Sequence, residues 1–175
     1  MEIGESLFKF RLKATNNRYY DNYTYADRTA LVLAVTCNHC PYARAYWDRL
    51  KKLYNKFEED NMMIMAINPN DPEQYPADSF ENMKVLKKEL DLPFPYLFDE
   101  TQEVAAKLGA TRTPEVFVFN SKRELVYKGA IDDNWEHADM VTRVYLDDAI
   151  EYTLDGMEPD FADVPAIGCS VKWKK

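Results

Sequence analysis

Apolar and polar residues alternate along the first 25 residues in the pattern of β-strands. Apolar side chains recur at every second position in 8–12. The polar residues 15–17 then offer a turn, and the β-prone run Tyr23-Thr24-Tyr25 follows it. Alternation with period two predicts strands with one buried face. We therefore expect an N-terminal β-hairpin or a pair of edge strands.

Two wholly apolar runs, 30–35 and 62–67, have the length of strands and no polar face. Such runs are typical of central parallel strands that are covered on both sides. Between them, apolar residues recur at helical spacing, which predicts a helix with one buried face. The residues that mark this face are Tyr46, Leu50, Leu53 and Phe57. The pattern thus predicts a strand, a helix and a second strand in succession.

The middle of the chain predicts a helix-containing insertion. A loop rich in proline and asparagine, 68–76, leads to a helix that we expect to run to about Leu90. Asp78 has the character of an N-cap residue, with Glu81 three positions later. After two prolines, 96–98 is predicted as a short strand and 101–108 as a short helix that ends at a glycine.

The last third of the chain predicts a hairpin and a final helix. The dipeptide Thr113-Pro114 comes directly before the strand 115–119, and a turn at 120–122 leads to a partner strand at 125–127. Apolar residues at helical spacing between 146 and 154 predict a last helix, which we expect to end at Gly156. We expect the remaining residues to be irregular.

We interpret residues 1–175 as one domain, with 1–28 as a hairpin extension and 157–175 as a C-terminal tail. Because no apolar stretch approaches the roughly 20 residues that span a bilayer, we expect no membrane association. The first residues lack the features of a secretory signal, which favours the cytoplasm. A net charge of −8 without a basic patch makes nucleic acid an unfavourable partner.

The motif Cys37-Asn38-His39-Cys40-Pro41 lies where the first buried strand meets the first helix. Unpaired backbone N–H groups and the helix dipole favour a thiolate at that position. Pro41 falls in the first helical turn, where a missing N–H costs least. Only three cysteines occur in the chain, so we interpret them as residues with a chemical role and not as parts of a disulfide scaffold.

The order of elements, the Cys37–Cys40 motif and Thr113-Pro114 together resemble the thioredoxin fold. The resemblance implies an α/β fold whose central mixed sheet is flanked by helices, with an N-terminal hairpin and a helix-containing insertion before the proline strand. It also implies that Pro114 is cis and lies with Thr113 beside the reactive cysteines. The insertion, together with the stretches 66–68, 79–83, 95–105 and 167–173, resembles the redoxin branch, which holds peroxiredoxin-like antioxidant proteins and thiol-disulfide oxidoreductases.

This resemblance implies a thiol-disulfide oxidoreductase. We expect Cys37 to be the exposed attacking thiol and Cys40 to resolve the mixed disulfide by forming a Cys37–Cys40 disulfide. His39 can stabilise the thiolate, which would make the disulfide more oxidising. Thioredoxin carries a buried aspartate in the strand before its first cysteine, and 30–35 has no acid. Glu115, His39 or water therefore has to take the proton.

Two other functions stay open. A peroxiredoxin-like peroxide reductase would use Cys37 or Cys40 with Cys169 as the resolving thiol. The proline-threonine pattern of a peroxidatic site is missing, but Arg44 and Arg112 can approach the site, which keeps this function open. Alternatively, the domain is a non-enzymatic interaction module or a zinc-binding protein that adds Cys169 and His39 to the pair. Cys169 can equally be a small buried apolar residue.

We expect no metal ion and no cofactor beyond a redox-active disulfide within the chain. The expected partners are protein or low-molecular-weight thiols and disulfides. The oligomeric state is open between a monomer, which we favour slightly, and a dimer.

Overall fold

A mixed β-sheet of eight strands forms the centre of the protein in the computed structural model, which describes all 175 residues. Its strands are β1 (Arg11–Ala14), β2 (Tyr19–Asp21), β3 (Ala30–Val35), β4 (Met62–Asn68), β5 (Tyr96–Phe98), β7 (Glu115–Phe119), β8 (Leu125–Gly129) and β9 (Asp163–Val164). Their order across the sheet is β2-β1-β5-β4-β3-β7-β8-β9. Two further strands, β6 (Arg112–Thr113) and β10 (Cys169–Ser170), pair separately.

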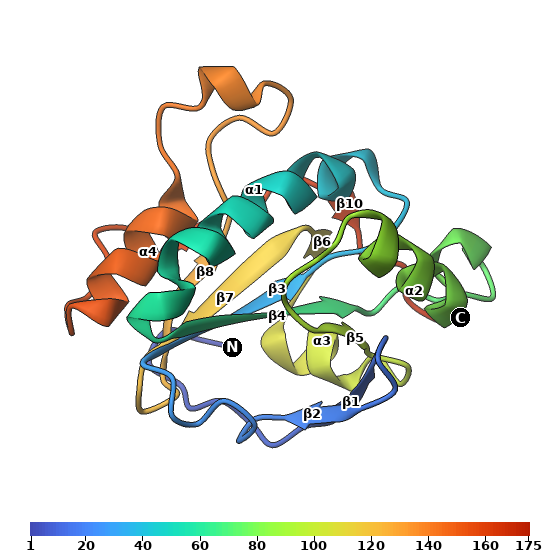
Figure 1. Cartoon of the computed structure of the whole chain (residues 1–175), viewed down its shortest axis with the longest axis horizontal. Coiled ribbons are helices and arrows are strands. Elements are labelled where there is room, and N and C mark those ends of the chain that lie inside the picture. Colours follow the sequence, from blue (N-terminus) through green and yellow to red (C-terminus); the bar gives the residue numbers. More distant parts are fainter.

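Four α-helices surround this sheet: α1 (Pro41–Phe57), α2 (Phe80–Glu89), α3 (Glu103–Leu108) and α4 (Tyr145–Leu154). Short 3-10 turns occur at η1 (Glu58–Asp60), η2 (Pro76–Asp78) and η3 (Ala138–Met140). Helices α1 and α4 cover one side of the sheet and α3 covers the other (Figure 1). This is the thioredoxin-like architecture that the sequence predicts, with α2, β5 and α3 inserted between β4 and β6. None of the helices has the length and apolar character needed to cross a membrane.

The centre of the sheet is the parallel pair β3 and β4, in register from Ala30 opposite Met62 to Val35 opposite Ile67. Every residue of both strands is buried, as expected for apolar runs with no polar face. Helix α1 packs its apolar stripe onto this pair, and Tyr46, Leu50, Leu53 and Phe57 are all buried. Because parallel strands end at the same edge, the residues that follow β3 and β4 meet there.

The predicted N-terminal hairpin is present, but its second strand comes earlier than expected. Strand β2 spans Tyr19–Asp21 and not the run at 23–25. The Asp21 carboxylate accepts the N–H of Tyr23 at 2.8 Å, and the N–H of Asp21 donates to the Thr24 hydroxyl at 2.8 Å. Such local hydrogen bonds from side chains compete with strand pairing. The chain therefore turns at residues 21–24, although the residue types at 23–25 favour a strand.

Two further boundaries differ from expectation. Ser79, not Asp78, caps α2, because its hydroxyl accepts the N–H of Asn82 at 3.1 Å. Helix α3 starts at Glu103 because Gln102 adopts a left-handed conformation. The C-terminal tail is not wholly irregular, since β9 extends the main sheet beside β8 and β10 pairs with β6.

Candidate functional site

The loop between β3 and α1 carries the first two cysteines to the edge of the sheet. Cys37 is the one free cysteine, and its side chain is fully buried. Its sulfur lies 3.5 Å from the Thr113 hydroxyl. The first cysteine was expected to be exposed, and this expectation is wrong for the state seen here.

Burial raises the pKa of the Cys37 thiol to about 11, and the nearby negative charge of Asp78 adds to the rise. The Thr113 hydroxyl and the backbone N–H groups of His39 and Cys40 act in the opposite direction, because they hydrogen-bond the thiolate. The helix start is thus placed to stabilise a thiolate, as the sequence predicts. In this closed state, however, burial is the larger effect and Cys37 is a protonated thiol at neutral pH.

Cys40 forms a disulfide with Cys169, which lies 129 residues later in the chain. Cys40 occupies the N-cap of α1, and Cys169 lies in β10 directly opposite Thr113 of β6. The expected Cys37–Cys40 disulfide is therefore not the one present. Sequence spacing favoured the nearer pair, whereas the return of the tail to the site brings Cys169 onto Cys40.

The Thr113-Pro114 peptide bond is cis, and both residues are buried next to the cysteines. Thr113 contacts both cysteine positions: its hydroxyl faces Cys37, and its carbonyl oxygen lies 3.6 Å from the Cys40 sulfur. The structure thus brings together the residues of the two motifs that the sequence singled out, although they are more than 70 positions apart.

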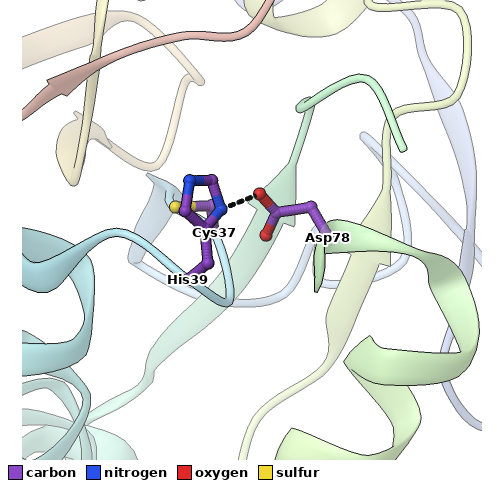
Figure 2. Close-up of side chains that lie close together, drawn as sticks. All are labelled: Cys37, His39 and Asp78. Carbon is purple, nitrogen blue, oxygen red and sulfur yellow. Dashed lines mark hydrogen bonds and ion pairs between the residues drawn. The ribbon is translucent and has the colours of Figure 1, made fainter. Parts of the chain in front are cut away.

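His39 is held by a buried carboxylate, that of Asp78 in η2. The two side chains point toward each other beside Cys37, with Nδ1 of His39 in contact with the carboxylate (Figure 2). His39 also stacks on the ring of Tyr75, with 5.5 Å between the ring centroids. A carboxylate on Nδ1 fixes the orientation of the imidazole and leaves Nε2 for a second partner.

The Asp78 carboxylate is fully buried and accepts several hydrogen bonds besides that of His39. The N–H of Asn38 donates at 2.7 Å, the side chain of Asn70 at 3.0 Å and that of Asn68 at 3.4 Å. These donors stabilise a buried carboxylate that would otherwise be costly. Asp78 therefore ties the cysteine loop to the segment that follows β4.

Sequence reasoning missed Asp78, which it interpreted as a helix cap. A signal was present, because Asp78 follows a proline- and asparagine-rich loop that leaves the end of a central parallel strand. Residues at that edge meet those that follow the neighbouring strand. Asp78 places beside Cys37 the carboxylate that β3 lacks.

Glu115 does not take the role that the sequence suggested for it. Its carboxylate accepts the N–H groups of Thr111 at 3.0 Å and Arg112 at 3.2 Å, so it stabilises the turn before Pro114 and makes no contact with Cys40. The alternation of side chains along a strand did not predict which face of β7 Glu115 lies on. Its carboxylate points toward the turn because the N–H groups there need an acceptor.

Cys37, His39 and Asp78 are the residues that could hold a metal ion, since one ligand atom of each lies within 4.8 Å of the others. The fit is poor, because structural zinc sites need four ligands and the Asp78 oxygens already accept several hydrogen bonds. The alternative zinc set of the sequence needs Cys40 and Cys169 as thiolates, and here these two sulfurs are joined.

The arginines that a peroxide site would need stay at the surface. Arg44 and Arg112 are both exposed, and neither side chain forms a hydrogen bond or ion pair with the site. The hydroxyl beside Cys37 belongs to Thr113, whereas the hydroxyl of Thr36 is buried without a hydrogen-bond partner.

Known proteins share this arrangement of elements over nearly the whole chain. A hypothetical protein SMc02350 from Sinorhizobium meliloti 1021 is 30% identical and covers 99% of this chain and 96% of its own, with a TM-score of 0.93. An uncharacterized conserved protein from Geobacillus kaustophilus is 35% identical and covers 99% and 93%, also with a TM-score of 0.93. Peroxidoxin BcpB from Mycobacterium tuberculosis, at 16% identity, covers 89% and 95% with a TM-score of 0.64, which supports the fold alone.

A comparison with curated proteins finds no match. The sequence pattern of the AhpC/TSA family matches residues 3–128, a span that runs from the N-terminal hairpin through the cysteine motif and Pro114 to β8. This redoxin family and the solved structures indicate an oxidoreductase with a thioredoxin-like fold. The chain belongs to the AhpC/TSA family.

Proposed function

We propose that the protein is a thiol-disulfide oxidoreductase that works with three cysteines. The observation that carries this proposal is a free thiol at the start of α1, Cys37, packed against Cys40 and its disulfide with Cys169. A thiol beside a disulfide is the reactant pair of disulfide exchange. The expected Cys37–Cys40 disulfide then becomes the second oxidised state of the same site.

The exchange step moves one disulfide bond without net oxidation. The Cys37 thiolate attacks the sulfur of Cys40, a bond forms between these two, and the bond from Cys40 to Cys169 breaks. Cys169 leaves as a thiolate and takes up a proton. An external dithiol can then reduce the Cys37–Cys40 disulfide by two electrons, and its own sulfurs become a disulfide.

His39 is suited to hold the proton that Cys37 loses. One of its ring nitrogens lies within 4.8 Å of the Cys37 sulfur, and Asp78 orients the ring through Nδ1. The Asp78 carboxylate holds the imidazole beside Cys37, so the ring can accept the proton that Cys37 gives up when it becomes a thiolate. His39 and Asp78 thus replace the buried aspartate that thioredoxin carries in the strand before its first cysteine.

A thiol-trapping redox titration in glutathione buffers tests this function, with mass mapping of the paired cysteines at each potential. We expect two reversible disulfides, Cys40–Cys169 and Cys37–Cys40. In Cys37→Ser only the first should remain, and catalysed reduction of protein or small disulfides should be lost. A Cys37→Ser variant that turns over as fast as the wild type would refute the proposal.

Peroxide reduction is a second candidate, because Cys40 is paired with a tail cysteine. Such a disulfide can arise when a thiolate takes oxygen from a peroxide and the resulting sulfenic acid condenses with a resolving thiol, which releases water. The position of Arg44 and Arg112 at the surface weighs against it. Hydrogen peroxide turnover by wild type, Cys37→Ser and Cys40→Ser decides between the two functions, and loss of turnover only in Cys40→Ser would favour the peroxidase.

The proposed partners are protein or low-molecular-weight thiols and disulfides. The cytoplasmic location stays a prediction from the sequence, as does the preference for a monomer.

A further inference from the structure

A cavity separate from the cysteines lies between the N-terminal hairpin and α3, and we call it the hairpin cavity. It has a volume of about 500 Å³ and is lined by residues of β1, β2, β5, α3 and the start of α2. Strands β1 and β2 form one edge of the sheet, and α3 lies beside them (Figure 1). A cavity of this size accommodates a small organic ligand.

The hairpin cavity is positively charged, although the whole chain has a net charge of −8. Lys9, Arg11 and Lys13 from the N-terminal segment and Lys107 from α3 line it, against two carboxylates. In the sequence the first three cations alternate with apolar residues, so they form no continuous basic run. Residues two positions apart in a strand share a face. The fold therefore gathers a basic surface that the sequence does not show as a cluster.

The four cations have no carboxylate partner within the protein. None of them takes part in an ion pair. Lys107 follows Glu103 by about one helical turn, a spacing at which opposite charges can pair. Its ammonium lies instead 5.4 Å from the centre of the Phe8 ring. The positive charges of the cavity are thus available to a negative charge from outside.

Aromatic rings hold the cations in place. The guanidinium carbon of Arg11 lies 4.0 Å from the centre of the Tyr19 ring, and the ammonium of Lys13 lies 5.7 Å from that of Phe80. A contact with a ring face stabilises a cation and leaves N–H groups free to donate to an anion. Because these donors are already positioned, less entropy is lost when an anion binds.

The same cavity offers surfaces for a flat ring. Phe80 stacks on Phe98 with 5.8 Å between the ring centroids, and both rings are only partly buried. Tyr19 is 51% exposed, and the guanidinium plane of Arg11 on its face can itself stack on a ring. Lys13 is directly opposite Tyr19 in β2 and directly opposite Phe98 in β5. A cation therefore lies between two exposed aromatic surfaces.

The carboxylates of Glu100 and Glu103 complete the polar lining. Both residues are exposed, and neither forms an ion pair with the cations of the cavity. Carboxylates accept hydrogen bonds from hydroxyl and amino groups, and they repel further negative charge. They disfavour a uniformly acidic partner, such as an acidic peptide. They favour a ligand that carries hydroxyl groups besides its anionic group.

We propose that the hairpin cavity binds a nucleotide, with its phosphates on the four cations, its base against the aromatic rings and its sugar hydroxyls on the two glutamates. A nucleotide joins a flat ring, hydroxyl groups and two or more negative charges in one small molecule. None of the three cysteines lines the cavity, so this inference does not rest on the proposed function.

Equilibrium dialysis of the full chain tests the proposal, with ADP as the probe at low ionic strength and without metal ions. Pyrophosphate tests the anionic part alone, and adenosine tests the base and sugar alone. The variants are Arg11→Gln and Tyr19→Ala. Their matched controls are Lys52→Gln, which removes an exposed cation of α1, and Tyr23→Ala, which removes an exposed ring; neither position lines the cavity.

We expect ADP to bind with a dissociation constant below about 1 mM, and pyrophosphate and adenosine each to bind at least about tenfold more weakly. Arg11→Gln should weaken the binding of ADP and of pyrophosphate about tenfold, because a charged donor to phosphate is lost. Tyr19→Ala should weaken ADP about tenfold through lost stacking and change pyrophosphate by less than about twofold. Both controls should bind ADP as the wild type does.

Three outcomes would overturn the inference. Wild type could retain no ADP at about 1 mM. Pyrophosphate could bind as tightly as ADP, which would indicate a surface for anions without a seat for the base. Lys52→Gln could weaken ADP as much as Arg11→Gln does, which would indicate general attraction by charge. The redox titration of the cysteines tests the proposed function separately, so neither result depends on the other.

Discussion

Removing the negative charge of Asp78 should lower the pKa of the Cys37 thiol. Burial and this charge together raise that pKa from 9.0 to about 11, so below pH 8 roughly a hundredfold less thiolate is present than for an ordinary cysteine. Asp78→Asn keeps the size of the side chain and removes the charge. More thiolate should then be present at any pH below the midpoint.

The magnitude follows from the geometry. Two unit charges separated by 4.8 Å, the largest distance between the ligand atoms of Cys37 and Asp78, interact by about 3.5 kcal/mol at an effective dielectric constant of about 20, or about 2.5 pKa units. The hydrogen bonds that the Asp78 carboxylate accepts spread its charge and reduce its effect on Cys37. Burial is the larger cause of the shift and stays in the variant. We therefore expect the pKa to fall by about one unit, which gives about tenfold faster alkylation at pH 8.

The assay is the pH profile of alkylation by iodoacetamide in the oxidised protein, followed by mass. Cys37 is the free thiol while Cys40 and Cys169 are joined, and mass mapping separates its alkylation from any at Cys169. The midpoint of the profile gives the pKa independently of how often the site opens. Glu115→Gln is the matched control, because its carboxylate faces the turn before Pro114 and the profile should not move.

Two results would refute this reasoning. A wild-type midpoint near 8.5 would show that burial does not suppress the thiolate. An unchanged midpoint in Asp78→Asn would show that this carboxylate does not act on Cys37.

Asp78→Asn should also lower the free energy of unfolding by about 2 kcal/mol, since an amide N–H₂ faces donors that a carboxylate oxygen had satisfied.

Three further predictions concern stability, each measured by denaturant unfolding. Tyr96→Phe removes the buried hydrogen bond of 2.7 Å from the tyrosine hydroxyl to the Asn38 side chain and should lower the free energy of unfolding by about 1–2 kcal/mol. Alkylation of Cys37 should also become faster. An unchanged denaturation midpoint would show that the bond contributes nothing to stability. Asp132→Ala should cost about 3 kcal/mol because it leaves Arg49 largely buried without its carboxylate, whereas a loss below 1 kcal/mol would contradict the assigned ion pair. Selective reduction of the disulfide, which links positions 129 residues apart, should cost about 3–4 kcal/mol, and equal stability of both redox states would argue against a closed loop in solution.

Most of the fold was predictable because its signals are local. The apolar runs 30–35 and 62–67 have the length of strands and no polar face, which favours central strands, and α1 follows from side chains that repeat at helical spacing. The motif at the start of α1 and the dipeptide Thr113-Pro114 also mark their positions without help from the rest of the chain. Hydrophobic periodicity and helix-terminus chemistry depend on near neighbours, so the sequence by itself determines them.

The state of the site was decided by the tertiary structure alone. The choice of Cys169 over Cys37 as partner of Cys40 depends on where a tail 129 residues away is laid down, and no local pattern encodes that. Asp78 has the sequence character of a helix cap, but in the folded chain it lies at the edge of the sheet, where its carboxylate contacts His39. Burial of Cys37 likewise comes from segments that meet only in the folded chain. Spacing along a sequence sets which groups are near the helix start, whereas contacts between distant segments set which of them are charged, paired or covered.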